Sequence, residues 1–60
     1  MNAKEIIKEL EQDGWKLVNV VGSHHQFKHP AKPGKVTVSV HKGEIHPKTL
    51  RSIRKQAGLL

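Results

Sequence analysis

The N-terminal segment has the apolar pattern of an amphipathic helix. Its apolar side chains recur at helical spacing and are Ile6, Ile7 and Leu10. Asn2 precedes Glu5 by three residues, which is the spacing of a capping box, and Gly14 marks the end of the pattern. The sequence therefore predicts a helix over residues 3–13 with a solvated polar side.

Three strands are predicted in the middle of the chain. Residues 15–21 are mostly aromatic and β-branched, and the run stops at Gly22-Ser23, which predicts a strand followed by a tight turn. Residues 24–29 and 35–41 are predicted as the next two strands, joined by a loop that contains two prolines and a glycine. Valines alternate with polar residues in the third strand, so we expect one buried face and one open face.

A second helix is predicted over residues 47–57. Pro47 suits the first helical position, His46 is the expected cap, and Gly58 provides the stop. The order helix, three antiparallel strands, helix predicts the α+β class. Both helices should cover the valine side of the sheet and leave its opposite face open to solvent.

The length of 60 residues predicts a single domain over residues 1–60 with a small core. We therefore expect every strong apolar residue to be needed for the core, including Leu17 and the valines of the first strand. The chain has no cysteine, so neither a disulfide nor a thiolate metal cluster can supplement the core. It has no apolar run typical of a signal peptide or a membrane span, which predicts a cytoplasmic protein.

The charge balance predicts a polyanionic partner. The chain has 11 Lys and Arg against 5 Asp and Glu, a formal net charge of +6. Nucleic acid, an acidic protein or an anionic membrane would be attracted by this excess, and the membrane ranks last because no strongly amphipathic basic helix dominates. The residues expected to contact an RNA backbone lie in the second helix and around the loop: Lys28, Lys32, Lys35, Lys48, Arg51, Arg54 and Lys55.

His24 is the histidine that the strand pattern places on the open face. Phe27 is the large apolar residue of the second strand, and if the core takes it, the period of two turns His24 the other way. A hairpin that pairs Lys28 with Lys35 would set His24 opposite Ser39, with His41 near. An exposed imidazole among hydroxyls and lysines suits proton transfer at a phosphodiester, where RNA supplies its own 2′-hydroxyl nucleophile.

The other histidines are predicted to have structural places. His25 and His29 share the phase of Phe27, and His41 and His46 fall at a turn and a cap, with His41 the better placed of these two to touch phosphate. The spacings do not form a metal motif, so we expect no metal and no cofactor.

Several runs of residues together resemble the HicA family of toxins. They span nearly the whole chain in the family's order and are GW at 14–15, GSHHQFKHP over 22–30, VTVSV over 36–40, IHP over 45–47 and LRSIRKQAGL over 50–59. The resemblance implies a fold similar to a double-stranded-RNA-binding domain. It also implies a ribonuclease that cleaves messenger RNA (mRNA) and arrests translation, with a HicB-type antitoxin that covers the active surface.

The resemblance also implies a role for His24. The histidine after the Gly-Ser pair is the catalytic one in the family, so Gly22 and Ser23 form the turn that precedes it. Beside His24, the residues selected to bind RNA at the site are Lys28, Lys35, Ser39 and His41. Ser39 or His41 could also assist in catalysis. The second proton-transfer group stays unassigned.

Two other functions remain open from the sequence. One is a non-catalytic RNA-binding module of the same fold, for which the change His24→Ala would alter neither RNA affinity nor toxicity. The other is a basic protein whose main role is to bind an acidic protein, in which case the free chain would neither slow growth nor degrade RNA.

Overall fold

A computed structural model describes all of residues 1–60. The chain begins with helix α1 (Ala3–Gln12), whose start is fixed by the predicted capping box. The Asn2 side chain accepts a hydrogen bond from the Glu5 N–H at 2.9 Å, and the Glu5 carboxylate accepts one from the Asn2 N–H at 2.9 Å. Both exchanges satisfy backbone groups that a helix N-terminus leaves unpaired. The predicted helix over 3–13 is confirmed except for its last residue, Asp13, which is the C-cap.

Helix α2 (Pro47–Gln56) is also bounded by the residues that the sequence indicates. His46 is the N-cap, and its Nδ1 accepts a hydrogen bond from the Lys48 N–H at 3.1 Å. At the other end Gly58 has φ +69°, and the Leu59 N–H donates to the Arg54 carbonyl at 2.8 Å. This is a Schellman ending, which requires the left-handed conformation at Gly58.

The sheet contains β1 (Lys16–Val21), β2 (His24–Lys28) and β3 (Val36–Ser39) in the order β1-β2-β3, with antiparallel pairing throughout. Each strand is shorter than the range predicted from composition. In β1 the register shifts between Leu17 and Asn19, so Val18 forms a bulge. The α-β-β-β-α order and the class α+β are confirmed, and the architecture is similar to double-stranded-RNA-binding folds.

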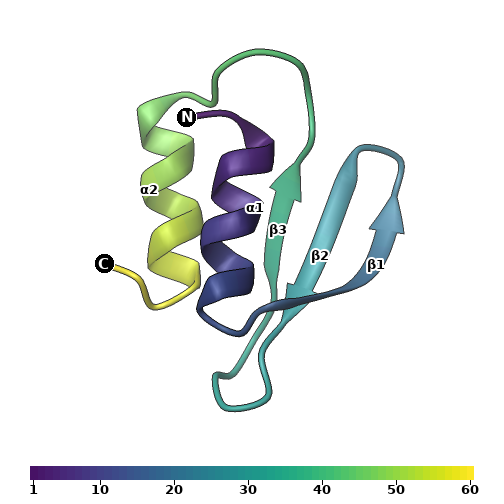
Figure 1. Cartoon of the computed structure of the whole chain (residues 1–60), viewed down its shortest axis with the longest axis vertical. Helices are drawn as coiled ribbons and strands as arrows, with labels where there is room; N and C mark the ends of the chain where they lie inside the picture. The colour runs from purple at the N-terminus through teal and green to yellow at the C-terminus, as the bar shows by residue number, and fades with distance from the viewer.

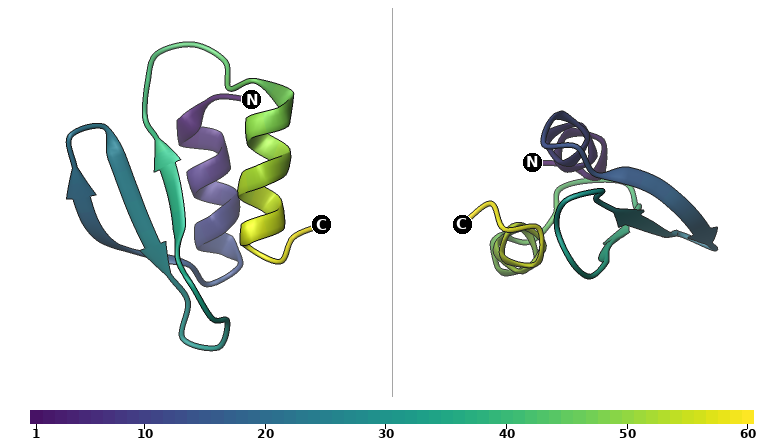
Figure 2. Two further views of the ribbon diagram at one scale, coloured as in Figure 1. Left: turned by 180° about the vertical axis from the view of Figure 1, so that it is seen from behind. Right: turned by 90° about the horizontal axis from the view of Figure 1, so that it is seen from below.

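The core lies between the two helices and the β3 side of the sheet. The helices run side by side in the same direction and both pack against β3, while β1 is the strand farthest from them (Figures 1 and 2). The buried residues are Ala3, Ile6, Leu10, Trp15, Phe27, Val36, Val38, Ile53 and Ala57. Thr37 and Ser39 alternate with the buried valines of β3 and are exposed, which confirms the predicted faces.

The expectation that every strong apolar residue belongs to the core is wrong for β1. Leu17, Val18, Val20 and Val21 are 47 %, 54 %, 48 % and 59 % exposed. Leu17 and Val20 pair with Phe27 and His25 on the helix side, and they are exposed because the helices lie over β3 and do not extend across the sheet to its β1 edge (Figure 1). Val21 pairs with His24 and therefore lies on the open face of the sheet. Neither helix is long and apolar enough to span a lipid bilayer.

Candidate active site

His24 is the first residue of β2 and follows the turn that joins β2 to β1. Gly22 has φ +59° in this two-residue turn between Val21 and His24, and the hairpin turn with a positive φ at its first central residue favours glycine there. Because Phe27 of the same strand is buried, the alternation of side chains turns His24 to the opposite face. The His24 side chain is exposed, as the sequence predicts.

Ser39 lies directly opposite His24 in the neighbouring strand, which confirms the predicted register. The Val40 N–H donates to the Ser23 carbonyl at 2.8 Å, so Ser23 and Val40 form a hydrogen-bonded pair. The next pair, His24 and Ser39, is then a non-hydrogen-bonded one, in which the side chains approach most closely. The imidazole and a hydroxyl therefore share one small area of the open face.

A shallow hollow adjoins this pair at the end of β3. It has a volume of about 260 Å³ and is lined by Ser39, His41, Lys42, Gly43, Glu44, Ile45 and Thr49. Ser39 and His41 thus border the same space, although His41 lies beyond the end of β3 rather than in it as predicted. Ser39 connects this hollow to the pair, and His24 itself is not part of the lining.

Lys28 and Lys35 lie at the other end of the sheet. Lys28 is the last residue of β2, four positions from His24, and it is exposed on the same face. At the rise of a β-strand, four positions correspond to about 13 Å. The predicted site therefore divides into a histidine end and a lysine end. Lys16, which sequence analysis did not select, is the β1 partner of Lys28 and belongs to the lysine end.

His25 and His29 occupy the structural places predicted for them. His25 pairs with the buried Val38 and is half-buried on the helix side of the sheet. His29 follows β2, and its Nδ1 accepts hydrogen bonds from the Ala31 N–H at 2.9 Å and the Lys32 N–H at 3.2 Å. The neutral ring must then carry its proton on Nε2, which donates to the Asp13 carbonyl at 2.7 Å. These bonds make His29 a structural link between α1 and the loop after β2.

Two of the cations predicted to contact RNA are instead paired with carboxylates of α1 and its C-cap. Lys32 Nζ lies 2.6 Å from the Asp13 carboxylate and donates to the Ala57 carbonyl at 3.0 Å. The Lys32 hydrogen bond lowers the pKa of Asp13 below its ordinary value. Arg54 contacts both Glu9 oxygens, at 2.9 and 3.1 Å, and its hydrogen bond lowers the pKa of that carboxyl. Lys32 and Arg54 therefore stabilise the packing of the loop and of α2 against α1.

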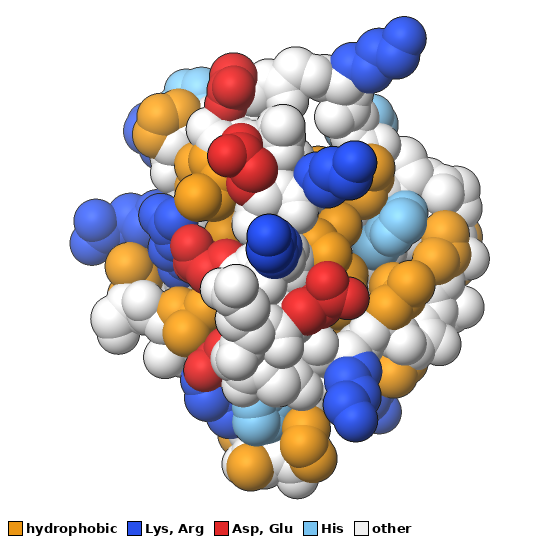
Figure 3. Space-filling model, viewed as in Figure 1, with side chains coloured by type: hydrophobic (Ala, Val, Ile, Leu, Met, Phe, Trp, Pro, Cys, Tyr) orange, Lys and Arg blue, Asp and Glu red, His pale blue; other side chains and the backbone are white.

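The carboxylates are segregated from the sheet. Residues 14–43 contain five lysines and no Asp or Glu, whereas four of the five acidic residues lie within α1 or at its C-cap. Figure 3 accordingly shows the acidic side chains gathered over the helical part of the molecule. A sheet with positive charges and no carboxylate creates a field that attracts a polyanion.

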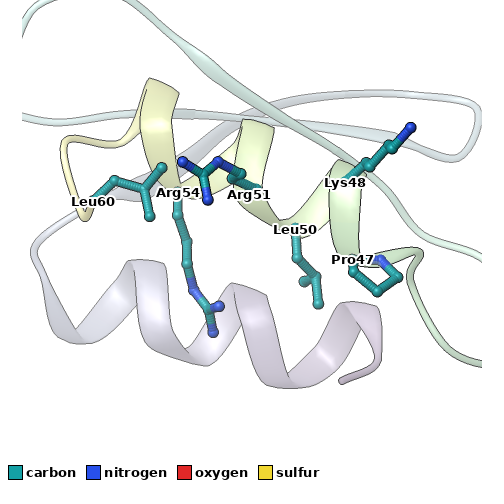
Figure 4. A pocket seen from close by; sticks show the side chains of 6 residues that line it. All are labelled: Pro47, Lys48, Leu50, Arg51, Arg54 and Leu60. Atoms are coloured by element: carbon teal, nitrogen blue, oxygen red, sulfur yellow. The ribbon is translucent and has the colours of Figure 1, made fainter.

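A second basic hollow lies on α2, apart from His24. It has a volume of about 380 Å³ and is lined by Pro47, Lys48, Leu50, Arg51, Arg54 and Leu60 (Figure 4). Arg54 extends from α2 toward α1, where it contacts Glu9, so Lys48 and Arg51 are the cations left at this surface (Figure 4). No group of three or more His, Cys, Asp or Glu side chains is arranged to hold a metal ion.

The fold and the exposed histidine define a small basic α+β domain of the double-stranded-RNA-binding type. A family model described as the HicA toxin of bacterial toxin-antitoxin matches residues 3–59. The chain therefore belongs to the HicA toxin family, and membership makes it the toxin of a toxin–antitoxin pair, with an antitoxin as partner. Among curated proteins, none matches the chain.

Proposed function

We propose that this toxin is an endoribonuclease that cleaves mRNA through His24 and thereby arrests translation. The observation that carries the proposal is the position of His24, whose exposed imidazole lies opposite the Ser39 hydroxyl on a sheet without carboxylates. An imidazole titrates close to neutral pH, and a positive sheet favours the approach of a phosphodiester. The cytoplasm is the compartment in which such a substrate would be met.

The proposed reaction uses the 2′-hydroxyl of the RNA itself. His24 accepts the proton of this hydroxyl, the 2′ oxygen forms a bond to the neighbouring phosphorus, and the bond from phosphorus to the 5′ oxygen breaks. The products are a 2′,3′-cyclic phosphate and a 5′-hydroxyl, whose proton must come from a general acid. His41, at the rim of the hollow beside Ser39, is the candidate donor. The scheme requires no metal ion.

Lys28 and Lys35 are proposed to bind backbone phosphates, and Ser39 to hydrogen-bond the reacting ribose or phosphate. Lys28 lies about 13 Å along β2 from His24, so these lysines would bind phosphates away from the cleaved linkage. The antitoxin is proposed to be of the HicB type and to cover the open face around His24, because a protein bound there would exclude RNA from the imidazole.

A matched pair of histidine variants tests the proposal. His24→Ala should lower the rate of RNA cleavage by about 10²–10⁴-fold, which is the range that general acid–base groups contribute, and should abolish growth arrest. His25→Ala removes the adjacent imidazole on the opposite face and should retain cleavage. Both are assayed with purified protein and RNA in EDTA, and by growth after induced expression.

Each contrary outcome points to a different function. Equal cleavage by the wild type and His24→Ala refutes the catalytic assignment. Equal growth arrest by both, with no RNA cleaved by either, favours the non-catalytic RNA-binding module. Loss of cleavage in EDTA refutes the metal-independent scheme.

A further inference from the structure

A row of three lysines crosses the open face of the sheet at the end opposite His24. Lys16 in β1 pairs with Lys28 in β2. Lys35 directly precedes Val36, whose partner is Phe27, so the same antiparallel register carries Lys35 alongside Lys28, one step beyond the last ladder pair. All three side chains are exposed. Neighbouring strands are about 4.8 Å apart, so the row is about 10 Å wide.

The row has an electrostatic cost that the fold does not compensate. Like charges on directly opposed strand positions destabilise a sheet. The ion pairs of the molecule join Met1 to Glu44, Asp13 to Lys32, and Glu9 to Arg54, and none involves the lysine row. The strands contain no acidic residue that could approach it. An anion from outside the molecule is what would neutralise these three charges.

Polar, uncharged side chains fill the space between the lysine row and His24. Asn19 pairs with Gln26, and Gln26 pairs with Thr37, so an amide, an amide and a hydroxyl lie across the sheet between its two ends. These groups can donate and accept hydrogen bonds with ribose hydroxyls and phosphate oxygens. The open face therefore offers a continuous polar track along β2 from the imidazole to the lysines.

We propose that the lysine row, Lys16, Lys28 and Lys35, is a phosphate-binding subsite for single-stranded RNA, separate from the cleaved linkage. This inference rests on the proposed function, since it takes the strand cleaved at His24 to continue along the track. The distance of about 13 Å between the two ends corresponds to about four nucleotides at the axial rise of a stacked strand, and to fewer when the strand is extended. The row thus binds the RNA strand a few nucleotides away from the cleaved linkage and fixes the direction in which the strand passes His24.

RNA is favoured over an acidic protein by the chemistry of the track. An added protein strand would pair with the backbone at the β1 edge, where four of the six exposed side chains are apolar, whereas the lysine row extends across all three strands on one face. A flexible polyanion with regularly spaced charges can contact the row and the polar groups beside it at the same time.

The test compares two variants that remove the same charge. The row variant carries Lys16→Gln, Lys28→Gln and Lys35→Gln. The control carries Lys4→Gln and Lys8→Glu, at two exposed positions of α1. Both are made in a His24→Ala background, so that RNA is bound and not cut, and binding of a fluorescent 12-nucleotide RNA is measured over a series of salt concentrations.

The row variant should reduce the slope of log K against log salt by about 2, because each phosphate contact with a single strand contributes about 0.7. The control should change the slope by much less, and the thermal stability of the row variant should be equal to that of its parent or higher. Equal slope changes in the two variants would mean that net charge alone attracts RNA, and would overturn the proposal. Unchanged RNA binding with lost binding of the purified antitoxin would make the row a protein interface and overturn it as well.

A second readout separates this inference from the proposed function. With His24 present, the row variant should raise KM for a 12-nucleotide RNA and leave kcat within about a factor of two, because the row does not contact the reacting atoms. If His24→Ala itself leaves cleavage intact, the catalytic proposal fails while the binding result of the row variant still stands. If only the slope result fails, the row is refuted and the catalytic proposal is untouched.

Discussion

Replacing Gly14 with alanine tests whether His29 is a structural link or a group available for chemistry. Gly14 has φ +104°, and a Cβ placed there would lie 2.7 Å from His29 Nε2. The backbone conformation costs an L-residue about 1–3 kcal/mol. The His29 ring must also move, which breaks its hydrogen bond to the Asp13 carbonyl at a further cost of about 1 kcal/mol. Gly14→Ala should therefore lower the free energy of unfolding by about 2–4 kcal/mol.

The matched control is Gly34→Ala, at φ +80° with no atom within 4 Å of the added Cβ. It should incur the backbone cost alone, about 1–3 kcal/mol. Urea unfolding followed by Trp15 fluorescence measures both, and the Gly14→Ala change is repeated in a His29→Ala background. In the His29→Ala background, the loss of unfolding free energy caused by Gly14→Ala should fall to that caused by Gly34→Ala. If Gly14→Ala lowers the free energy of unfolding equally with and without His29, the ring does not pack against Gly14 and the predicted steric cost is wrong.

Two further predictions concern packing and pH. Val38→Ala removes a fully buried side chain and should cost about 1.5–3 kcal/mol in urea unfolding, whereas Val20→Ala, at an edge strand position that is 48 % exposed, should cost less than about 1 kcal/mol; equal costs would contradict the burial described for β1. Lys32 lowers the pKa of Asp13, so their ion pair contributes stability above about pH 4 that is lost as the pH falls further. Lys32→Gln should therefore make the acid side of the stability profile shallower, and an unchanged profile would exclude the pair as a source of stability.

The position of His24 could be predicted because local rules determine it. Phe27 is the large apolar side chain of its strand, so burial of Phe27 fixes the phase of the whole strand by the period of two. The helix boundaries were predictable for the same reason, since Asn2, His46 and Pro47 form caps with residues a few positions away.

The exposure of β1 could not be predicted in this way. Leu17, Val18, Val20 and Val21 are as apolar as the residues of a buried strand. Leu17 and Val20 are uncovered because the helices lie over β3, and Val21 because it shares the open face with His24. The run of apolar residues also gives no alternation from which a face could be chosen. The bulge at Val18 contributes to this, because it interrupts the register that two faces would require.

Contacts between distant residues separate the structural cations from those available to RNA. Lys32 is paired with Asp13, which is 19 positions away along the chain, and Arg54 with Glu9, which is 45 positions away. At such separations the sequence gives no signal that two residues are in contact. From the sequence alone, Lys32 and Arg54 are therefore indistinguishable from Lys28 and Lys35. Lys16 gives no signal in the sequence, because its place beside Lys28 depends on the register of the β1 bulge.

If His24 takes the proton of a ribose 2′-hydroxyl, the loss of that one hydroxyl from an RNA should prevent its cleavage. The linkage that the wild-type protein cleaves is first mapped, and the same oligonucleotide is then made with one 2′-deoxy nucleotide on the 5′ side of that linkage. In EDTA, the all-RNA strand should be cut at this linkage to a 2′,3′-cyclic phosphate, and the substituted strand should not be cut there. Cleavage of the substituted linkage at a comparable rate would rule out the 2′-hydroxyl as the nucleophile.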